Sequence, residues 1–161
     1  MFYIYEFIFF VFIIFSPIIF FIRIITGKED PKRFLEKFTL YSNRQNKIRT
    51  IWFHGASIGE ITSILPIIEV LEKNKKIKKI LLTSSTTSSV SVIKKYKFKK
   101  TVHVFFPIDT NFLSNRFIRY WKPKVALFID SEIWPNMFKN LNKNNIPIIL
   151  LNGRITKKSF L

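Results

Sequence analysis

The fold is decided by the stretch His54-Gly55-Ala56-Ser57-Ile58-Gly59-Glu60, which follows a short apolar run at residues 51–53. This order predicts a strand, a tight turn and a helix whose first turn carries the carboxylate of Glu60. In an open α/β sheet, such a junction faces the ligand crevice at the carboxyl ends of the strands. A second acidic cluster, Asp130 and Glu132, follows another apolar run at residues 125–129. Because both clusters follow predicted strands, we expect them to share one site.

The rest of the chain after residue 48 alternates between apolar runs and segments with helical spacing. The runs are rich in Ile, Val, Leu and Phe, as buried parallel strands are, and occupy residues 48–53, 80–83, 102–106, 125–129 and 146–151. Between the first two runs, apolar residues recur at the spacing of one helix face. Strands that alternate with helices predict an α/β fold, namely a Rossmann-like parallel sheet of about five strands.

Residues 1–25 differ from the rest because they are almost entirely apolar, with Glu6 and Arg23 as the charged residues. About 20 apolar residues span a bilayer as a helix, so we predict an N-terminal membrane-anchor helix. A cleaved signal peptide fits less well, since no basic residue precedes the apolar run and no small-x-small site follows it. A buried core helix is disfavoured by Phe and Ile on every face. Basic residues follow the segment, which predicts that the domain faces the cytoplasm.

The charge of the chain is strongly positive, with 27 Lys and Arg against 10 Asp and Glu, a net +17. Such a charge favours an anionic partner, for example the anionic cytoplasmic leaflet of a membrane, although the lysine runs themselves are better explained as a solvated surface. There is no RNP-like aromatic motif and no evident helix-turn-helix, so nucleic acid is not expected as a partner. The absence of cysteine excludes thiol catalysis, and two distant histidines disfavour a zinc site.

The predicted organisation has three parts. Residues 1–25 form the anchor, residues 26–47 a basic linker with a short helix, and residues 48–161 a Rossmann-like domain. The last apolar run ends in a glycine turn at Gly153. Since such a turn normally leads into another element, we expect this chain to be one half of something larger.

Ser57 and Glu60 have the spacing of a capping box, in which Ser57 caps the helix and Glu60 reaches back to the backbone amide of Ser57. The alternative is a general base, since a carboxylate at a helix N-terminus is favoured by the exposed amides and can take a proton from an attacking sugar hydroxyl. Gly55 and Gly59 would let a substrate approach the backbone closely.

Other candidates lie at the ends of the predicted strands. Residues 83–89 are rich in hydroxyl groups, and Thr83 and Ser85 could bind a sugar or phosphate, or the segment could simply cap the next helix. The segment lacks the glycines and lysine of a P-loop, so an ATPase is not supported. Arg154 could bind a phosphate or a sugar carboxylate. Asp109 is expected to cap the helix that follows it.

Taken together, these segments resemble the N-terminal half of the bacterial 3-deoxy-D-manno-octulosonic acid (Kdo) transferases, glycosyltransferase family 30. The motifs that carry the resemblance are residues 52–60 (WFHGASIGE), 82–86 (LTSST), 106–109 (FPID), 121–124 (WKPK), 132–136 (EIWPN), 146–147 (IP) and 152–154 (NGR). The resemblance implies a GT-B glycosyltransferase with two Rossmann-like domains. It implies an inverting transfer of Kdo from CMP-Kdo to the lipid A precursor lipid IVA, in lipopolysaccharide biosynthesis, without a cofactor or bound metal.

The resemblance also assigns roles to residues. The family's catalytic base falls on Glu60, and its second acidic position falls on Asp130, where the family commonly has Glu and the side chain here is one methylene shorter. Glu132 matches the other acidic residue, and Ser57, Gly59, Thr83, Ser85 and Arg154 are candidate substrate-binding residues. We expect the C-terminal donor domain to be missing from this chain, and therefore expect the chain alone to be inactive. The alternative is a membrane-anchored, non-catalytic domain that binds an anionic lipid or polymer.

Overall fold

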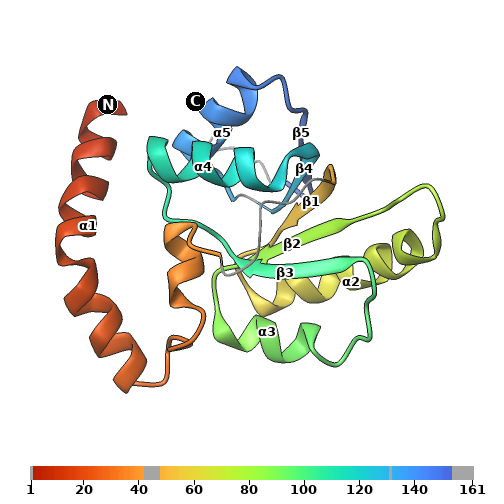
Figure 1. Cartoon of the computed structure of the whole chain (residues 1–161), viewed down its shortest axis with the longest axis horizontal. Helices are drawn as coiled ribbons and strands as arrows, with labels where there is room; N and C mark the ends of the chain where they lie inside the picture. Colours follow the sequence, from red (N-terminus) through yellow and green to blue (C-terminus); the bar gives the residue numbers. More distant parts are fainter. Residues whose placement is uncertain (1, 42–47, 131, 154–161) are drawn as a thin grey trace.

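The computed structural model describes residues 2–41, 48–130 and 132–153 (Figure 1). The helices and strands follow one another as α1 (Phe2–Ile25), η1 (Phe34–Phe38), β1 (Thr50–His54), α2 (Ile58–Lys73), β2 (Ile80–Ser84), α3 (Thr87–Ile93), β3 (Thr101–Phe105), α4 (Asn111–Trp121), β4 (Pro123–Ile129), α5 (Pro135–Lys143) and β5 (Ile148–Leu151). The five predicted apolar runs all contain strands, with ends that differ by up to two residues.

The five strands form one parallel sheet in the order β3-β2-β1-β4-β5, which confirms the predicted Rossmann-like α/β fold. The chain winds outward from β1 in one direction through β2 and β3, and then crosses to β4 and β5. In such doubly wound sheets, ligands bind at the carboxyl ends of the two strands where the winding reverses. Here these strands are β1 and β4, which are paired with His54 opposite Phe128.

Helices cover both faces of the sheet, with α2 and α3 on one side and α4 and α5 on the other (Figure 1). Neighbouring residues of β1 point to opposite faces because the side chains of a strand alternate. Trp52 packs in one buried cluster with Phe117 of α4 and Met137 of α5, and Phe53 packs in the other with Ile61 of α2. Burial on both faces is the reason that the strands read as continuous apolar runs.

The helix α1 contacts the domain along part of its length. Phe20 packs against Phe34 and Phe38 of η1, and the hydroxyl of Tyr5 donates a hydrogen bond of 2.8 Å to Oδ2 of Asp109. Other apolar side chains of α1, such as Ile18, are exposed. Among the described residues, we find no helix whose length and hydropathy suffice to cross a bilayer, so the predicted anchor is not confirmed.

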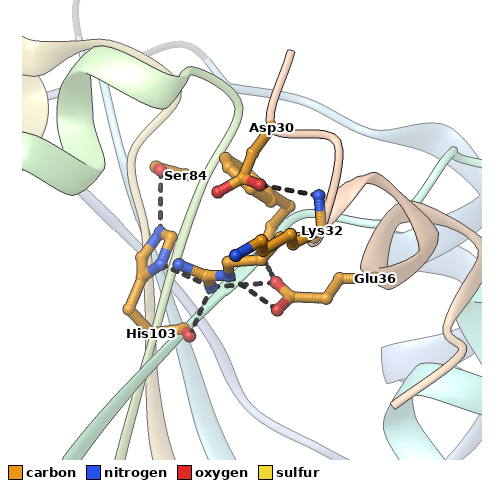
Figure 2. A network of polar contacts seen from close by, with 7 residues as sticks. Asp30, Lys32, Glu36, Ser84 and His103 are labelled. Carbon is orange, nitrogen blue, oxygen red and sulfur yellow. Dashed lines mark hydrogen bonds and ion pairs between the residues drawn. The ribbon is translucent and has the colours of Figure 1, made fainter. Parts of the chain in front are cut away.

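A polar network joins η1 to the edge strand β3 (Figure 2). Arg33 donates to both carboxylate oxygens of Glu36 at 2.8 and 2.9 Å and to the carbonyl of His103 at 2.9 Å. Glu36 in turn accepts from the backbone N–H of Phe105 at 2.9 Å, and His103 Nε2 lies 2.9 Å from Ser84 Oγ. The network therefore satisfies backbone groups on the outer side of β3, which protects an edge that is otherwise open to pairing with another strand.

Asp109 caps a different helix from the predicted one. Thr110 is the N-cap of α4, and its side chain accepts from Leu113 N. Asp109 is fully buried and instead accepts from the backbone N–H groups of Asn136 (2.9 Å) and Met137 (2.8 Å), at the start of α5. The first turn of α5 is thus fixed by a carboxylate from a distant segment.

Candidate active site

The carboxylate of Glu60 lies in the first turn of α2, immediately after the carboxyl end of β1. Ser57 is the N-cap, and its Oγ accepts from Glu60 N at 3.3 Å while donating to Glu60 Oε1 at 2.7 Å. Glu60 Oε2 accepts from Ala56 N at 2.7 Å. The capping box is therefore present, but the carboxylate binds the amide of Ala56 rather than the predicted amide of Ser57.

This arrangement leaves Glu60 available for chemistry. The side chain is only partly buried, and each carboxylate oxygen accepts one hydrogen bond from the protein and has a second lone pair free to accept another. The N-terminus of α2 favours negative charge at this position. Cap and general base are thus compatible roles for one carboxylate that is held in a fixed orientation.

The two glycines of the turn have different structural roles. A Cβ on Gly55 would lie 3.0 Å from Glu60 Cβ and 3.3 Å from Ile61 Cδ1. Gly55 therefore lets the first turn of α2 approach the end of β1 closely, which positions Glu60. A Cβ on Gly59 would meet only Ser57 Oγ, at 3.9 Å. The space beside Gly59 is open, which is compatible with the predicted close approach of a substrate.

Asp130 follows β4 in the left-handed region, with a φ of 56°. Its N–H donates to the carbonyl of Leu151 at 2.8 Å, and its Oδ1 accepts from Asn152 Nδ2 at 2.6 Å. Residues other than glycine adopt this conformation uncommonly, although Asp and Asn tolerate it best. The conformation turns the chain sharply at the end of β4, between Ile129 and the acidic residue Glu132.

Glu132 is half-buried and lies against two ring nitrogens. Its Oε2 accepts from Trp134 Nε1 at 3.1 Å, and His54 Nε2 is 3.8 Å from the same oxygen. The neighbouring His54 imidazole is the main cause of a lowered pKa at Glu132, and the Trp134 indole contributes, while partial burial acts in the opposite direction. Glu132 is thus held as a carboxylate next to the end of β1.

Thr83 and Ser85 have different surroundings. Thr83 is fully buried, and its Oγ1 lies 2.9 Å from Trp52 Nε1, 2.9 Å from His54 Nδ1 and 3.3 Å from the carbonyl of Phe53. Ser85 is half-buried and lines a cavity of about 310 Å³. That cavity is mainly apolar and is lined by Ile8, Phe9, Lys37, Ser85, Phe106, Pro107, Ile108, Asp109 and Trp134. Ser85 is therefore the more accessible of the two hydroxyls.

The structure brings the candidates of β1, β2 and β4 to the carboxyl edge of one sheet. Glu60 follows β1 and the two other acidic residues follow β4, so the predicted acidic clusters do share this edge. Arg154 lies outside the described residues, as does Ser131. His54 was not predicted as a site residue. The alternation of β1 places it on the same face as Trp52, but its contact with Glu132 depends on how the loop after β4 folds.

Comparisons with known proteins agree with the geometry. The family model described as 3-deoxy-D-manno-octulosonic-acid transferase (kdotransferase) matches residues 32–161. A 3-deoxy-D-manno-octulosonic acid transferase of Rickettsia bellii is 34% identical over 143 residues, which is 89% of this chain and 34% of the relative. A probable mitochondrial 3-deoxy-D-manno-octulosonic acid transferase of Arabidopsis thaliana is 35% identical over 138 residues, which is 86% of this chain and 31% of the relative.

A third relative, from Haemophilus influenzae and with the same transferase name, is 27% identical over 129 residues. The match covers 80% of this chain and 30% of the relative. The chain thus spans about a third of the length of the curated relatives it matches. Since the family model covers most of the chain, the chain belongs to the 3-deoxy-D-manno-octulosonic acid transferase family.

Proposed function

We propose that this chain forms the acceptor-side part of an inverting glycosyltransferase, which transfers Kdo from CMP-Kdo to the lipid A precursor lipid IVA in lipopolysaccharide biosynthesis. The observation that carries the proposal is the Glu60 carboxylate, held by Ala56 N and Ser57 Oγ at the point where the winding of the sheet reverses. The names of the relatives from Rickettsia bellii and Haemophilus influenzae support the same activity.

In the proposed reaction, a hydroxyl oxygen of the acceptor attacks the anomeric carbon of Kdo. The bond between that carbon and the phosphate oxygen of CMP breaks, its electron pair leaves with CMP, and the anomeric configuration inverts. Glu60 accepts the proton of the attacking hydroxyl. The mechanism assigns no step to a metal or cofactor.

The other candidates have supporting roles in the proposal. Ser57 and the open backbone at Gly59 lie next to the base, where they would contact the acceptor. Ser85 would contact it from the end of β2, and Arg154 would bind an anionic group of a substrate. Asp130 and Glu132 border the same edge from β4, where their charge would orient hydroxyl groups of the sugar by accepting hydrogen bonds.

The domain is proposed to act at the membrane surface. Exposed apolar side chains on α1, among them Ile14, Ile18, Phe21, Ile22 and Ile25, support contact with the acyl region of the cytoplasmic leaflet of the inner membrane. The net charge of +17 supports attraction to an anionic leaflet. Attachment there would bring Glu60 to a lipid-borne acceptor.

The donor half is proposed to lie in a further domain, because this chain matches only about a third of its relatives. A hybrid tests the proposal: this chain replaces the matching segment of the Rickettsia bellii relative, and transfer of radiolabelled Kdo from CMP-Kdo to lipid IVA is measured. We expect turnover by the hybrid and none by the 161-residue chain alone. An inactive but folded hybrid, beside an active parent relative, would contradict the proposal.

Glu60→Gln in the hybrid tests the general base. Removing such a base typically costs about 10²- to 10⁴-fold in rate, and we expect a loss of kcat in that range. Glu69→Gln is the matched control, because Glu69 is an exposed carboxylate on the same helix. Near-native turnover by the Glu60→Gln hybrid would reject the role of Glu60 while leaving the family assignment intact.

A further inference from the structure

A chain of three buried side chains leads from the core to Glu132. It begins at the indole of Trp52, continues through the hydroxyl of Thr83 and ends at the imidazole of His54; all three residues are fully buried. Thr83 of β2 pairs directly with His54 of β1, which brings the hydroxyl beside the ring. The contacts are 2.9 Å from Trp52 Nε1 to Thr83 Oγ1 and 2.9 Å from Thr83 Oγ1 to His54 Nδ1.

The protons along this chain follow from the chemistry of the groups. The indole N–H can only donate, so Thr83 Oγ1 accepts from Trp52. The hydroxyl has one proton to give, and it lies 2.9 Å from His54 Nδ1 but 3.3 Å from the carbonyl of Phe53. If that proton is directed at the Phe53 carbonyl, Nδ1 carries the imidazole proton and donates to Oγ1; if it is directed at Nδ1, the hydroxyl donates to the ring. A neutral imidazole whose Nδ1 accepts carries its proton on Nε2.

The other side of the ring selects between these two arrangements. His54 Nε2 is buried, has no hydrogen-bond partner in the described structure and lies 3.8 Å from Glu132 Oε2. A bare nitrogen there would direct its lone pair at a carboxylate, whereas an N–H directs a positive hydrogen at it. Burial lowers the pKa of His54, which keeps the ring neutral. Phe106 stacks on the ring at 4.0 Å between centroids and restricts its orientation.

We propose that His54 is a positioning residue, which accepts from the Thr83 hydroxyl at Nδ1 and is held as the Nε2–H tautomer, so that it directs this proton at the Glu132 carboxylate. The proposal rests on the proposed function only in taking Glu132 as part of the transferase site. It gives the buried Thr83 hydroxyl a role in setting that tautomer instead of binding substrate.

The distance of 3.8 Å from His54 Nε2 to Glu132 Oε2 is too long for a hydrogen bond, which requires about 2.7–3.2 Å. Hydrogen bonds in catalytic sites are often long before substrate binds and shorten in the complex. A shift of Glu132 by about 1 Å closes the contact. The carboxylate would then be held by two N–H donors, those of Trp134 and His54, while its other oxygen stays free to accept from a sugar hydroxyl.

Nuclear magnetic resonance of the 161-residue chain tests the tautomer without any assay of activity. The chain has only two histidines, so a long-range proton–nitrogen spectrum of the imidazoles contains few signals, and a His103→Gln variant assigns those of His54. We expect a protonated Nε2 and a bare Nδ1 at neutral pH. A proton on Nδ1, or an equal mixture of tautomers, would overturn the proposal.

Activity of the hybrid enzyme tests the consequence. Thr83→Val keeps the shape but removes the hydroxyl, and Thr83→Ser restores it. As with the outer partners of metal-binding histidines, we expect Thr83→Val to lower kcat about tenfold or more and Thr83→Ser to recover most of it. Thr50→Val is the matched control, since Thr50 of β1 is also fully buried and, among the described residues, its hydroxyl donates to the carbonyl of Trp121 at 3.1 Å.

The outcomes separate the two proposals. Equal kcat for Thr83→Val and the unmodified hybrid, or equal losses for Thr83→Val and Thr83→Ser, would refute the positioning role. An unmodified hybrid without turnover would count against the proposed function, and the spectrum of the chain would still decide the tautomer of His54.

Discussion

The buried carboxylate of Asp109 accepts hydrogen bonds from several segments of the domain. We predict that Asp109→Asn strongly lowers the free energy of unfolding of the domain. Both oxygens serve a backbone N–H at the start of α5: Oδ2 accepts from Asn136 at 2.9 Å, and Oδ1 accepts from Met137 at 2.8 Å. Oδ2 also accepts from Tyr5 OH at 2.8 Å, and Oδ1 from Ser114 Oγ at 3.0 Å. Four donors thus converge on one side chain.

An asparagine cannot replace this arrangement in either orientation. Its NH₂ group must face one of the two backbone N–H groups, because each carboxylate oxygen accepts from one. One charge-assisted hydrogen bond, worth about 1.5–3 kcal/mol, is lost, and a buried N–H is left unsatisfied. We therefore expect the free energy of unfolding to fall by about 3 kcal/mol, a large part of the roughly 5–15 kcal/mol that stabilises a typical domain.

Urea denaturation followed by circular dichroism measures this change. Tyr5→Phe is the companion variant, since it removes one donor from Oδ2 but leaves both backbone contacts. Burial, together with Asp109, raises the pKa of Tyr5 and keeps its hydroxyl a donor. For Tyr5→Phe we expect a loss of about 1 kcal/mol. If Asp109→Asn costs no more than Tyr5→Phe, the reasoning about two irreplaceable acceptors is wrong.

Two further predictions concern pH and the turn before Glu60. Burial and the nearby Arg33 guanidinium lower the pKa of His103 to about 3, so the unfolded chain takes up this proton first as the pH falls. The stability that neutral His103 contributes is complete above pH about 6.5 and is lost between there and pH about 3, up to roughly 5 kcal/mol. Urea titrations across this range should show a shallower dependence for His103→Gln; an unchanged dependence would contradict the assignment. Gly59→Ala should leave stability equal or raise it by about 0.5–1 kcal/mol, since the added methyl meets only open space, whereas it should raise KM for the acceptor in the hybrid. A variant with unchanged KM would show that no substrate approaches this backbone.

The sequence predicted the features that depend on neighbouring residues. Apolar runs at strand spacing indicated the parallel sheet, because its strands are buried on both faces. The capping box of Ser57 and Glu60 was also readable, since its partners lie three residues apart. Only the predicted partner of Glu60 was wrong, by one residue. The side chain folds back over the turn and accepts from the amide of Ala56 instead of that of Ser57.

Features that depend on distant segments could not be predicted in the same way. Asp109 was expected to cap the helix after it, but Thr110 fills that position and frees the carboxylate for α5, 27 residues away. The contact of Thr83 with His54 depends on the register of β1 against β2. Composition does not determine this register, so the contacts among Trp52, Thr83 and His54 beside Glu132 could be found only from the structure.

Two of the carboxylates at the sheet edge, those of Glu60 and Glu132, are supported from opposite faces. Glu60 is carried by α2, whose Ile61 packs in the cluster with Phe53. Glu132 lies against His54, whose ring packs with Phe106 and Phe128 in the contacts of the other face. Since alternate residues of β1 separate these two clusters, repacking one face should disturb one carboxylate and leave the other in place. The proposed base, supported by one core, and the proposed orienting carboxylate, supported by the other, can therefore be altered independently.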